Sequence, residues 1–139
     1  MPISTAIFWP VIAQVALIHL IYFLMLKRRN SAMRAGTAKA SDFWVPAIEP
    51  EPSATVARSL INQFELPVLF FLVCVLLHLT AGVNYAVLAL AWLFVLSRFA
   101  HAYVHVTSNR LQIRQRFFVT GFVLNFSLWL LFAIHLAGI

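Results

Sequence analysis

Three polar residues, Arg58, Asn62 and Glu65, stand at the head of a long apolar run that continues to His78. Positions i, i+4 and i+7 of an α-helix share one face, so a helix would place this cation, amide and carboxylate side by side over roughly 10 Å of its axis. An ionisable group inside a bilayer costs roughly 3 kcal/mol or more unless it is paired or meets a polar ligand. These three residues, called the polar stripe below, are therefore a candidate binding site for a polar molecule.

A second group of polar residues lies in the next apolar run. Arg98, His101 and His105 follow the spacing i, i+3, i+7, which also places them on one helical face. If this face met the polar stripe, in the same chain or in a neighbouring one, the two would form a cationic cavity with a single carboxylate. Such a cavity suits a small zwitterionic molecule that carries more than one carboxylate.

The composition requires these residues to be positioned by membrane helices. The chain has 139 residues, of which 63% are hydrophobic and 10% charged, and its mean hydropathy is +0.91, whereas soluble domains are about a quarter charged. A membrane-spanning helix needs about 20 apolar residues. Four runs of this kind fill the chain, and they predict an all-α, antiparallel bundle of four transmembrane helices in a single domain. The expected spans are residues 6–26, 54–80, 85–107 and 116–136.

The distribution of charge predicts the orientation in the membrane. Seven of the ten Lys and Arg residues lie in the expected loop 27–53 and in the connection 108–115, which predicts that both loops are cytoplasmic and both termini outside. This placement explains the net charge of +6, so we expect the lipid bilayer and no nucleic acid as a partner. The localisation that we expect is multi-pass insertion in a bacterial inner membrane. Pro67 inside the second span predicts a kink.

Simpler interpretations compete with a functional one. Arg58 and Glu65 could form a structural ion pair, and Arg98 could extend toward the lipid headgroups. For Arg110 and Arg116 we favour contact with lipid phosphates, whereas for Asn62 and Glu65 we favour function, because an ionisable group within a membrane is by default a functional hypothesis. The single cysteine, Cys74, excludes an intrachain disulfide and is best interpreted as a buried apolar residue. We expect no metal site.

The motif Arg58-x3-Asn62-x2-Glu65-x-Pro67, at the head of the second of four spans, resembles the signature of the MAPEG family, the membrane-associated proteins of eicosanoid and glutathione metabolism. The pattern Arg98-x2-His101, with arginines just before the fourth span, is similar to a second block of that family. The resemblance covers the whole chain in length, number of spans and loop charge. It implies a homotrimer with glutathione as the co-substrate, bound at subunit interfaces that open to the cytoplasm.

The resemblance also implies roles for individual residues. Glu65 would bind the ammonium of the γ-glutamyl group, and Lys27 or Arg28 would bind a glutathione carboxylate. His105 departs from the tyrosine that is more usual at its position. The implied glutathione-binding residues are Arg28, Arg58, Asn62, Glu65, Arg98, His101, His105 and Arg110.

Arg114 falls where catalytic members have the arginine that stabilises the glutathione thiolate, with Arg110 as a rival for this role. A thiol with a pKa near 8.5 is mostly protonated at pH 7, and lowering the pKa by one requires about 1.4 kcal/mol of preference for the anion. A guanidinium within hydrogen-bonding reach, in a partly desolvated cleft, can supply this energy.

Three functions are consistent with the sequence. The first is an enzyme, a transferase that conjugates glutathione to a lipophilic small molecule or a peroxidase that reduces a lipid hydroperoxide. The second is a haem-binding membrane cytochrome, suggested by five histidines spread over the four spans. The third is a non-catalytic MAPEG-like protein that binds lipid or serves as an accessory subunit of a membrane complex.

Overall fold

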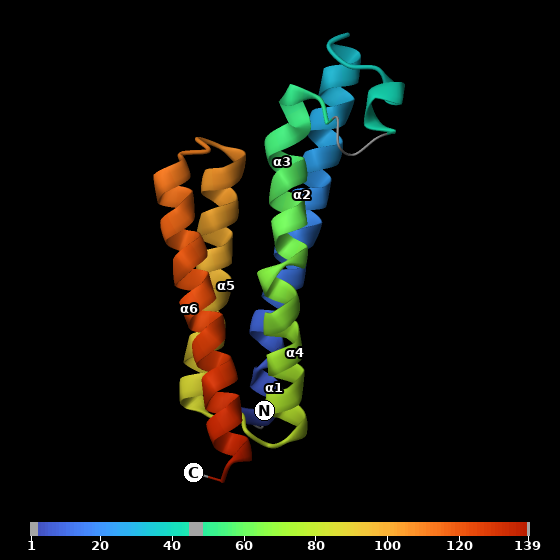
Figure 1. Cartoon of the computed structure of the whole chain (residues 1–139). Helices are drawn as coiled ribbons and strands as arrows, with labels where there is room; N and C mark the ends of the chain where they lie inside the picture. Colours follow the sequence, from blue (N-terminus) through green and yellow to red (C-terminus); the bar gives the residue numbers. More distant parts are fainter. Residues whose placement is uncertain (1–2, 45–48, 139) are drawn as a thin grey trace.

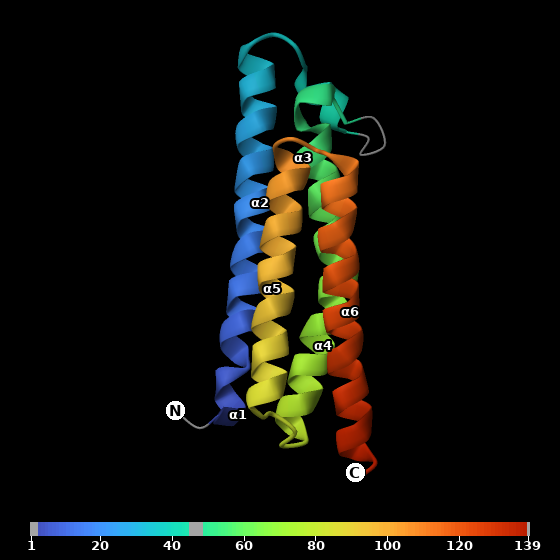
Figure 2. The same cartoon turned by 90° about the vertical axis from the view of Figure 1, so that its left-hand side faces the viewer.

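The structure is a computed structural model that describes residues 3–44 and 49–138. Four of its helical segments are long and apolar enough to cross a membrane. They run antiparallel, so both termini and the turn after α4 lie at one end, called the terminal end below (Figures 1 and 2). The opposite end, which carries the Lys- and Arg-rich connections, is called the basic end. The elements are α1 (Ile3–Ala6), α2 (Phe8–Arg34), η1 (Ala40–Phe43), α3 (Glu51–Ile61), η3 (Asn62–Phe64), α4 (Leu66–Leu79), α5 (Tyr85–Val106) and α6 (Leu111–Leu136).

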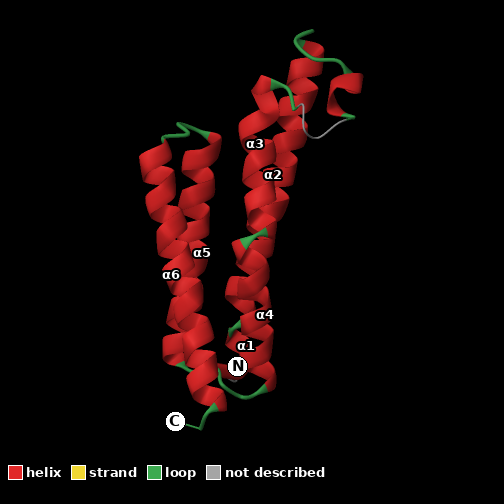
Figure 3. Ribbon diagram, viewed as in Figure 1, coloured by secondary structure: helices red, strands yellow, loops and turns green. Residues whose placement is uncertain are grey.

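The predicted all-α, four-span fold is confirmed, and the described residues contain helices and connections without a strand (Figure 3). Helix boundaries differ from the expected spans at the basic end. There α2 continues to Arg34, and α6 begins at Leu111 within the stretch expected to be a polar connection. The apolar runs predict where the membrane lies, but Lys, Arg and Gln are good helix formers, so the helices continue past the apolar residues.

Two prolines interrupt the first two spans. Pro10 has no N–H to donate to the carbonyl of Ala6, and α1 is separated from α2 at Ile7. Pro67 likewise cannot donate to the carbonyl of Gln63, and between α3 and α4 the chain forms the 3-10 turn η3 followed by Glu65 (Figure 3). The kink expected from Pro67 is therefore present. Helix α3 begins at Glu51 with Pro52 in its first turn, where a proline is tolerated.

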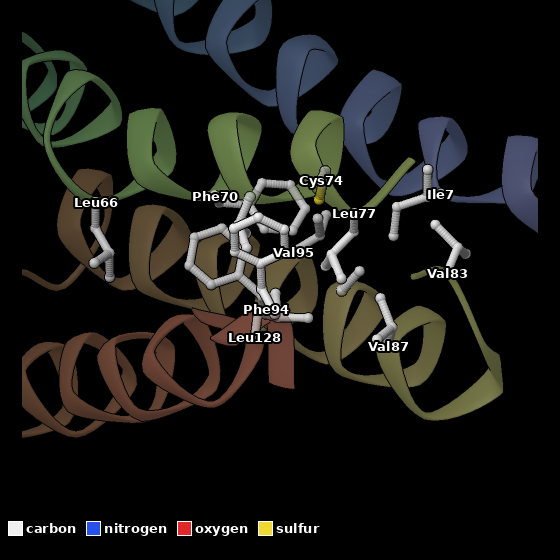
Figure 4. Close-up of a cluster of buried hydrophobic side chains, with 13 residues drawn as sticks. Ile7, Leu66, Phe70, Cys74, Leu77, Val83, Val87, Phe94, Val95 and Leu128 are labelled. Carbon is white, nitrogen blue, oxygen red and sulfur yellow. The ribbon is translucent and has the colours of Figure 1, made fainter. Parts of the chain in front are cut away.

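Apolar packing is concentrated toward the terminal end. Phe70 of α4 stacks on Phe94 of α5 with ring centroids 4.4 Å apart, and Leu128 of α6 closes the same cluster (Figure 4). Cys74 is buried in this cluster as a free thiol, as expected for an apolar core residue. A smaller cluster nearer the basic end joins α2, α3 and α5, and includes Ile21, Met25 and Val56. The terminal half of the bundle is thus a tightly packed apolar core.

Helices α5 and α6 pack closely against each other at Gly121. Gly121 of α6 is buried, and a Cβ atom added there would lie 3.0 Å from Oγ of Ser97 and 3.5 Å from Cδ of Arg98. A contact of 3.0 Å is shorter than ordinary van der Waals distances, so a side chain at this position would require Ser97 or the helices to shift. This packing fixes the distance between α6 and the buried Arg98.

Two residues of the connection between α2 and α3, Phe43 and Glu49, contact Arg29 of α2. Arg29 donates from Nε to Oε1 of Glu49 at 2.9 Å and from Nη2 to Oε2 at 2.6 Å, and its guanidinium lies 5.0 Å from the centre of the Phe43 ring. The hydrogen bonds from Arg29 hold the pKa of the Glu49 carboxyl below its ordinary value of 4.5, against the opposing effect of partial burial. The ion pair therefore contributes fully above pH 4.5 and is lost as the pH falls through the lower pKa of the folded state.

Substituting Gly121→Leu is expected to separate α5 from α6 and to destabilise the protein by about 1–3 kcal/mol, because a side chain is forced into a filled space. Thermal unfolding of the purified protein in detergent measures the effect. Thr120→Leu, which introduces the same side chain at an exposed neighbouring position, is the matched control. Equal unfolding temperatures for the two variants would contradict the close packing at Gly121.

Substituting Arg29→Gln is expected to raise the pKa of Glu49, because the carboxylate loses its charged donor. The NMR titration of the Glu49 side-chain carboxyl carbon measures this directly. Arg34→Gln, at the exposed end of the same helix, should leave the titration unchanged, and an unchanged midpoint in both variants would show that the ion pair is not formed.

Candidate functional site

A pocket of about 180 Å³ lies near the basic end, between η3, α5 and α6. It brings together three of the residues predicted from the sequence, Asn62, His101 and Arg114. Its lining therefore combines an amide, an imidazole and a guanidinium with apolar side chains. The lining residues are Asn62, His101, Leu111, Arg114, Gln115 and Phe118.

Asn62 is placed by the break before Pro67. Its side-chain Nδ2 lies 3.5 Å from Nδ1 of His105, and its backbone carbonyl accepts a hydrogen bond from Nη2 of Arg98 at 3.3 Å. Both partners belong to α5, so the 3-10 turn is anchored to the neighbouring helix. This anchoring keeps the Asn62 side chain at the pocket.

Arg98 is fully buried behind Asn62, so it does not extend toward the headgroups. Its guanidinium lies 5.9 Å from the centre of the Phe118 ring and interacts electrostatically with Glu65. Among the described residues, its Nε and Nη1 atoms have no hydrogen-bond partner. Arg98 therefore supports the pocket from within the bundle and is not part of its lining.

The two histidines of α5 are also buried, with ring centroids 5.7 Å apart. His101 contacts the ring of Phe118 at a centroid distance of 6.0 Å, and its Nδ1 has no partner among the described residues. His105 contacts Asn62 and lies within the electrostatic influence of Arg58 and Arg114. The predicted helical face of α5 is therefore directed at η3 and α6.

Of the two rival arginines before the fourth span, only Arg114 is among the residues that line this pocket. Its Nη1 donates to Oδ1 of Asn109 at 2.6 Å. Asn109 has a φ of +48°, a left-handed conformation that asparagine tolerates better than most residues, and it ends the turn before α6. Arg110 is exposed at the residue that precedes α6.

The polar stripe is less regular than predicted. Arg58 is exposed in the last turn of α3, whereas Asn62 and Glu65 follow the end of that helix, so the three residues do not share a continuous α-helical face. The physical reason is the missing N–H of Pro67. The one ion pair among the described residues joins Arg29 to Glu49, so the ion pair considered between Arg58 and Glu65 is not formed. Both side chains remain available at the surface beside the pocket.

Comparison with protein families matches residues 6–134 to the MAPEG family. The match covers nearly the whole chain and all four candidate spans, apart from the first residues of the first span and the last residues of the fourth. The chain belongs to the MAPEG family. Its four-helix, membrane-spanning fold is the fold of that family. Searches of curated proteins and of solved structures found no match to the chain.

Arg28 of α2, another residue predicted to bind glutathione, forms hydrogen bonds to two other helices of this MAPEG protein, α3 and α5. It donates from Nη1 to Oγ1 of Thr55 at 3.0 Å and from Nη2 to the backbone carbonyl of Val106. It is not among the residues that line the pocket within one chain. Lys27 is exposed on the outer face of α2.

Three lining residues of the MAPEG pocket were not predicted. Leu111, Gln115 and Phe118 follow the spacing i, i+4, i+7, and Arg114 falls on the same face. Residues 111–115, at the start of α6, were expected to be a connection, which concealed this spacing. Continuing the helical periodicity back to Leu111 would have found all three.

The remaining histidines of this MAPEG chain each meet a backbone carbonyl. His78 Nδ1 lies 3.0 Å from the carbonyl of Ser4, and His135 Nε2 lies 2.9 Å from that of Thr80. His19 Nδ1 is 2.9 Å from the carbonyl of Val15. A hydrogen-bonded structural histidine accounts for each of these contacts, and none of them favours the haem hypothesis.

Arg98→Met is expected to be better tolerated than Arg98→Ala. Methionine fills most of the volume of the arginine stem without a buried charge, whereas alanine leaves a cavity, so their free energies of unfolding should differ by about 2 kcal/mol or more. Denaturant titration in micelles measures both values. Equal stability of the two variants would show that the packed stem of Arg98 contributes nothing.

Proposed function

We propose that this MAPEG protein binds glutathione at the pocket and uses its thiolate to modify a lipophilic substrate. The observation that carries the proposal is the convergence of Asn62, His101 and Arg114 on one pocket near the basic end. Glutathione is a polar tripeptide with an ammonium and more than one carboxylate. A pocket that offers a guanidinium, an amide and an imidazole, with the carboxylate of Glu65 nearby, provides polar and charged partners for these groups.

Arg114 has the role of stabilising the thiolate. One guanidinium nitrogen is occupied by Asn109, but a guanidinium has five N–H donors, so others can meet a sulfur in the pocket. Hydrogen bonds to charged groups contribute about 1.5–3 kcal/mol. This energy is enough to lower the pKa of the bound thiol by about one to two.

The binding site is completed by a neighbouring subunit of a homotrimer. A volume of about 180 Å³ is below the range of about 300–1,000 Å³ that is usual for ligand pockets. Arg58, Glu65 and Arg110 are exposed beside the pocket in the single chain, where a second subunit would cover them together with bound ligand. Lys27 or Arg28 of that neighbour would supply a cation for a glutathione carboxylate.

The second substrate enters from the bilayer. Leu111 and Phe118 are exposed apolar residues in the lining of the pocket, so a lipophilic electrophile or lipid hydroperoxide can approach the thiolate along α6. The basic end is then the cytoplasmic side of a bacterial inner membrane, in accord with the distribution of Lys and Arg. Transferase and peroxidase reactions both begin from the same thiolate.

A non-catalytic member of the family is the second candidate. The 2.6 Å hydrogen bond between Arg114 and Asn109 favours it, because an arginine that remains bound to the turn would orient the loop and not the sulfur. In that case the protein binds glutathione or a lipid without forming thiolate.

Arg114→Ala is expected to reduce turnover with a model electrophile at pH 7 by about ten- to a hundredfold, since each tenfold corresponds to about 1.4 kcal/mol. The absorbance of bound thiolate at about 240 nm should decrease in parallel, with its midpoint moved to higher pH. Isothermal titration calorimetry of the purified protein measures glutathione binding itself.

Arg116→Ala, which removes an exposed arginine of the same helix outside the pocket lining, is the matched control and should retain activity. Absence of glutathione binding by the unmodified protein would refute the proposal. Binding without thiolate absorbance, in the unmodified protein and in Arg114→Ala alike, would identify the non-catalytic member.

A further inference from the structure

A pair of buried glutamines joins the first span to the break in the second. Gln14 of α2 and Gln63 of η3 are both fully buried, and Nε2 of Gln14 donates to Oε1 of Gln63 at 2.9 Å. Nε2 of Gln63 donates in turn to the backbone carbonyl of Ser59 at 3.3 Å. Polar side chains within a bilayer have few alternative partners, so this chain of amides is a specific contact between the two spans.

Because Gln63 lies in the 3-10 turn before Pro67, this contact helps to hold the turn in place. In a continuous α-helix the carbonyl of Gln63 would accept from residue 67, but Pro67 has no N–H. The 3-10 turn therefore lacks this helical hydrogen bond, and contacts from two neighbouring helices help to hold it. Arg98 of α5 holds the carbonyl of Asn62 from one side, and Gln14 of α2 holds the side chain of Gln63 from the other.

Two adjacent residues of η3 thus point in different directions. Asn62 is directed at the pocket, and Gln63, the next residue, is directed away from it toward α2. Rotation of the turn about its axis would move Asn62 and Glu65 relative to the histidines of α5. A contact that fixes Gln63 therefore also fixes the direction of Asn62.

We propose that Gln14 and Gln63 are positioning residues, which set the orientation of the 3-10 turn and thereby the affinity of the pocket for glutathione. The proposal rests on the proposed function for its ligand. Neither glutamine is in the pocket lining. The thiolate-stabilising Arg114 belongs to α6, so the contact should affect the binding of the tripeptide and not the ionisation of its thiol.

The test is Gln14→Met, which preserves length and removes the amide, together with Gln63→Met and the double variant. Loss of an interhelical hydrogen bond in a membrane is expected to raise the Kd for glutathione about three- to fifteenfold. The midpoint pH of the thiolate absorbance should not change, and the double variant should bind no more weakly than either single one. Gln112→Met, at an exposed position of α6, is the control.

Hydrogen–deuterium exchange provides a readout that does not need the ligand. Faster exchange in Gln14→Met, confined to residues 60–66, is expected if the contact holds the turn. Unchanged affinity with unchanged exchange would overturn the inference, and so would faster exchange throughout the bundle, or a shifted thiolate midpoint, because these indicate general loosening. If the unmodified protein binds no glutathione, the proposed function fails, and exchange at residues 60–66 alone decides whether the glutamines hold the turn.

Discussion

The structure depends on one missing N–H group inside a membrane. Pro67 cannot donate a hydrogen bond, and in hydrocarbon there is no water to replace it, so the residues before it must be held by other helices. Arg98 and Gln14 supply these contacts from α5 and α2. The break thus draws polar side chains from three spans to a single level of the bundle. A binding site for a polar molecule can exist within the membrane because its polar groups are already required there to stabilise the fold.

The bundle combines two kinds of packing. Toward the terminal end, stacked Phe70 and Phe94 and the apolar residues around them hold α4, α5 and α6 together. Toward the basic end, a smaller apolar cluster joins α2, α3 and α5, and charged and amide groups around Asn62 join η3 to α5. Figure 1 shows the α5–α6 pair diverging from the α2–α3 pair in this direction. A rigid apolar half can support a polar half whose side chains are not all satisfied internally, which is what a ligand site requires.

Several features were predictable because they depend on one-dimensional patterns. Four apolar runs determine four spans, Pro67 implies a break, and Cys74 in the centre of an apolar run is buried. The continuous face for Arg58, Asn62 and Glu65 was wrong because helical spacing assumes a regular helix, and the proline that marks the family motif also ends that regularity. The start of α6 was placed too late for a related reason. Apolar content locates the membrane, whereas arginine and glutamine extend the helix beyond it.

The sequence by itself determined the all-α membrane fold, the number of spans, the family resemblance and the set of charged residues from which the site is drawn. The length of an apolar run and the spacing of a motif suffice for these, since each helix satisfies its own backbone. Only the tertiary structure decided which of those residues meet. It placed Arg114 at the pocket, buried Arg98 behind it, engaged Arg28 between helices and paired Gln14 with Gln63. These contacts depend on how each helix is rotated against its neighbours, and that rotation is set by packing across the bundle, such as the close approach at Gly121, which no local pattern encodes.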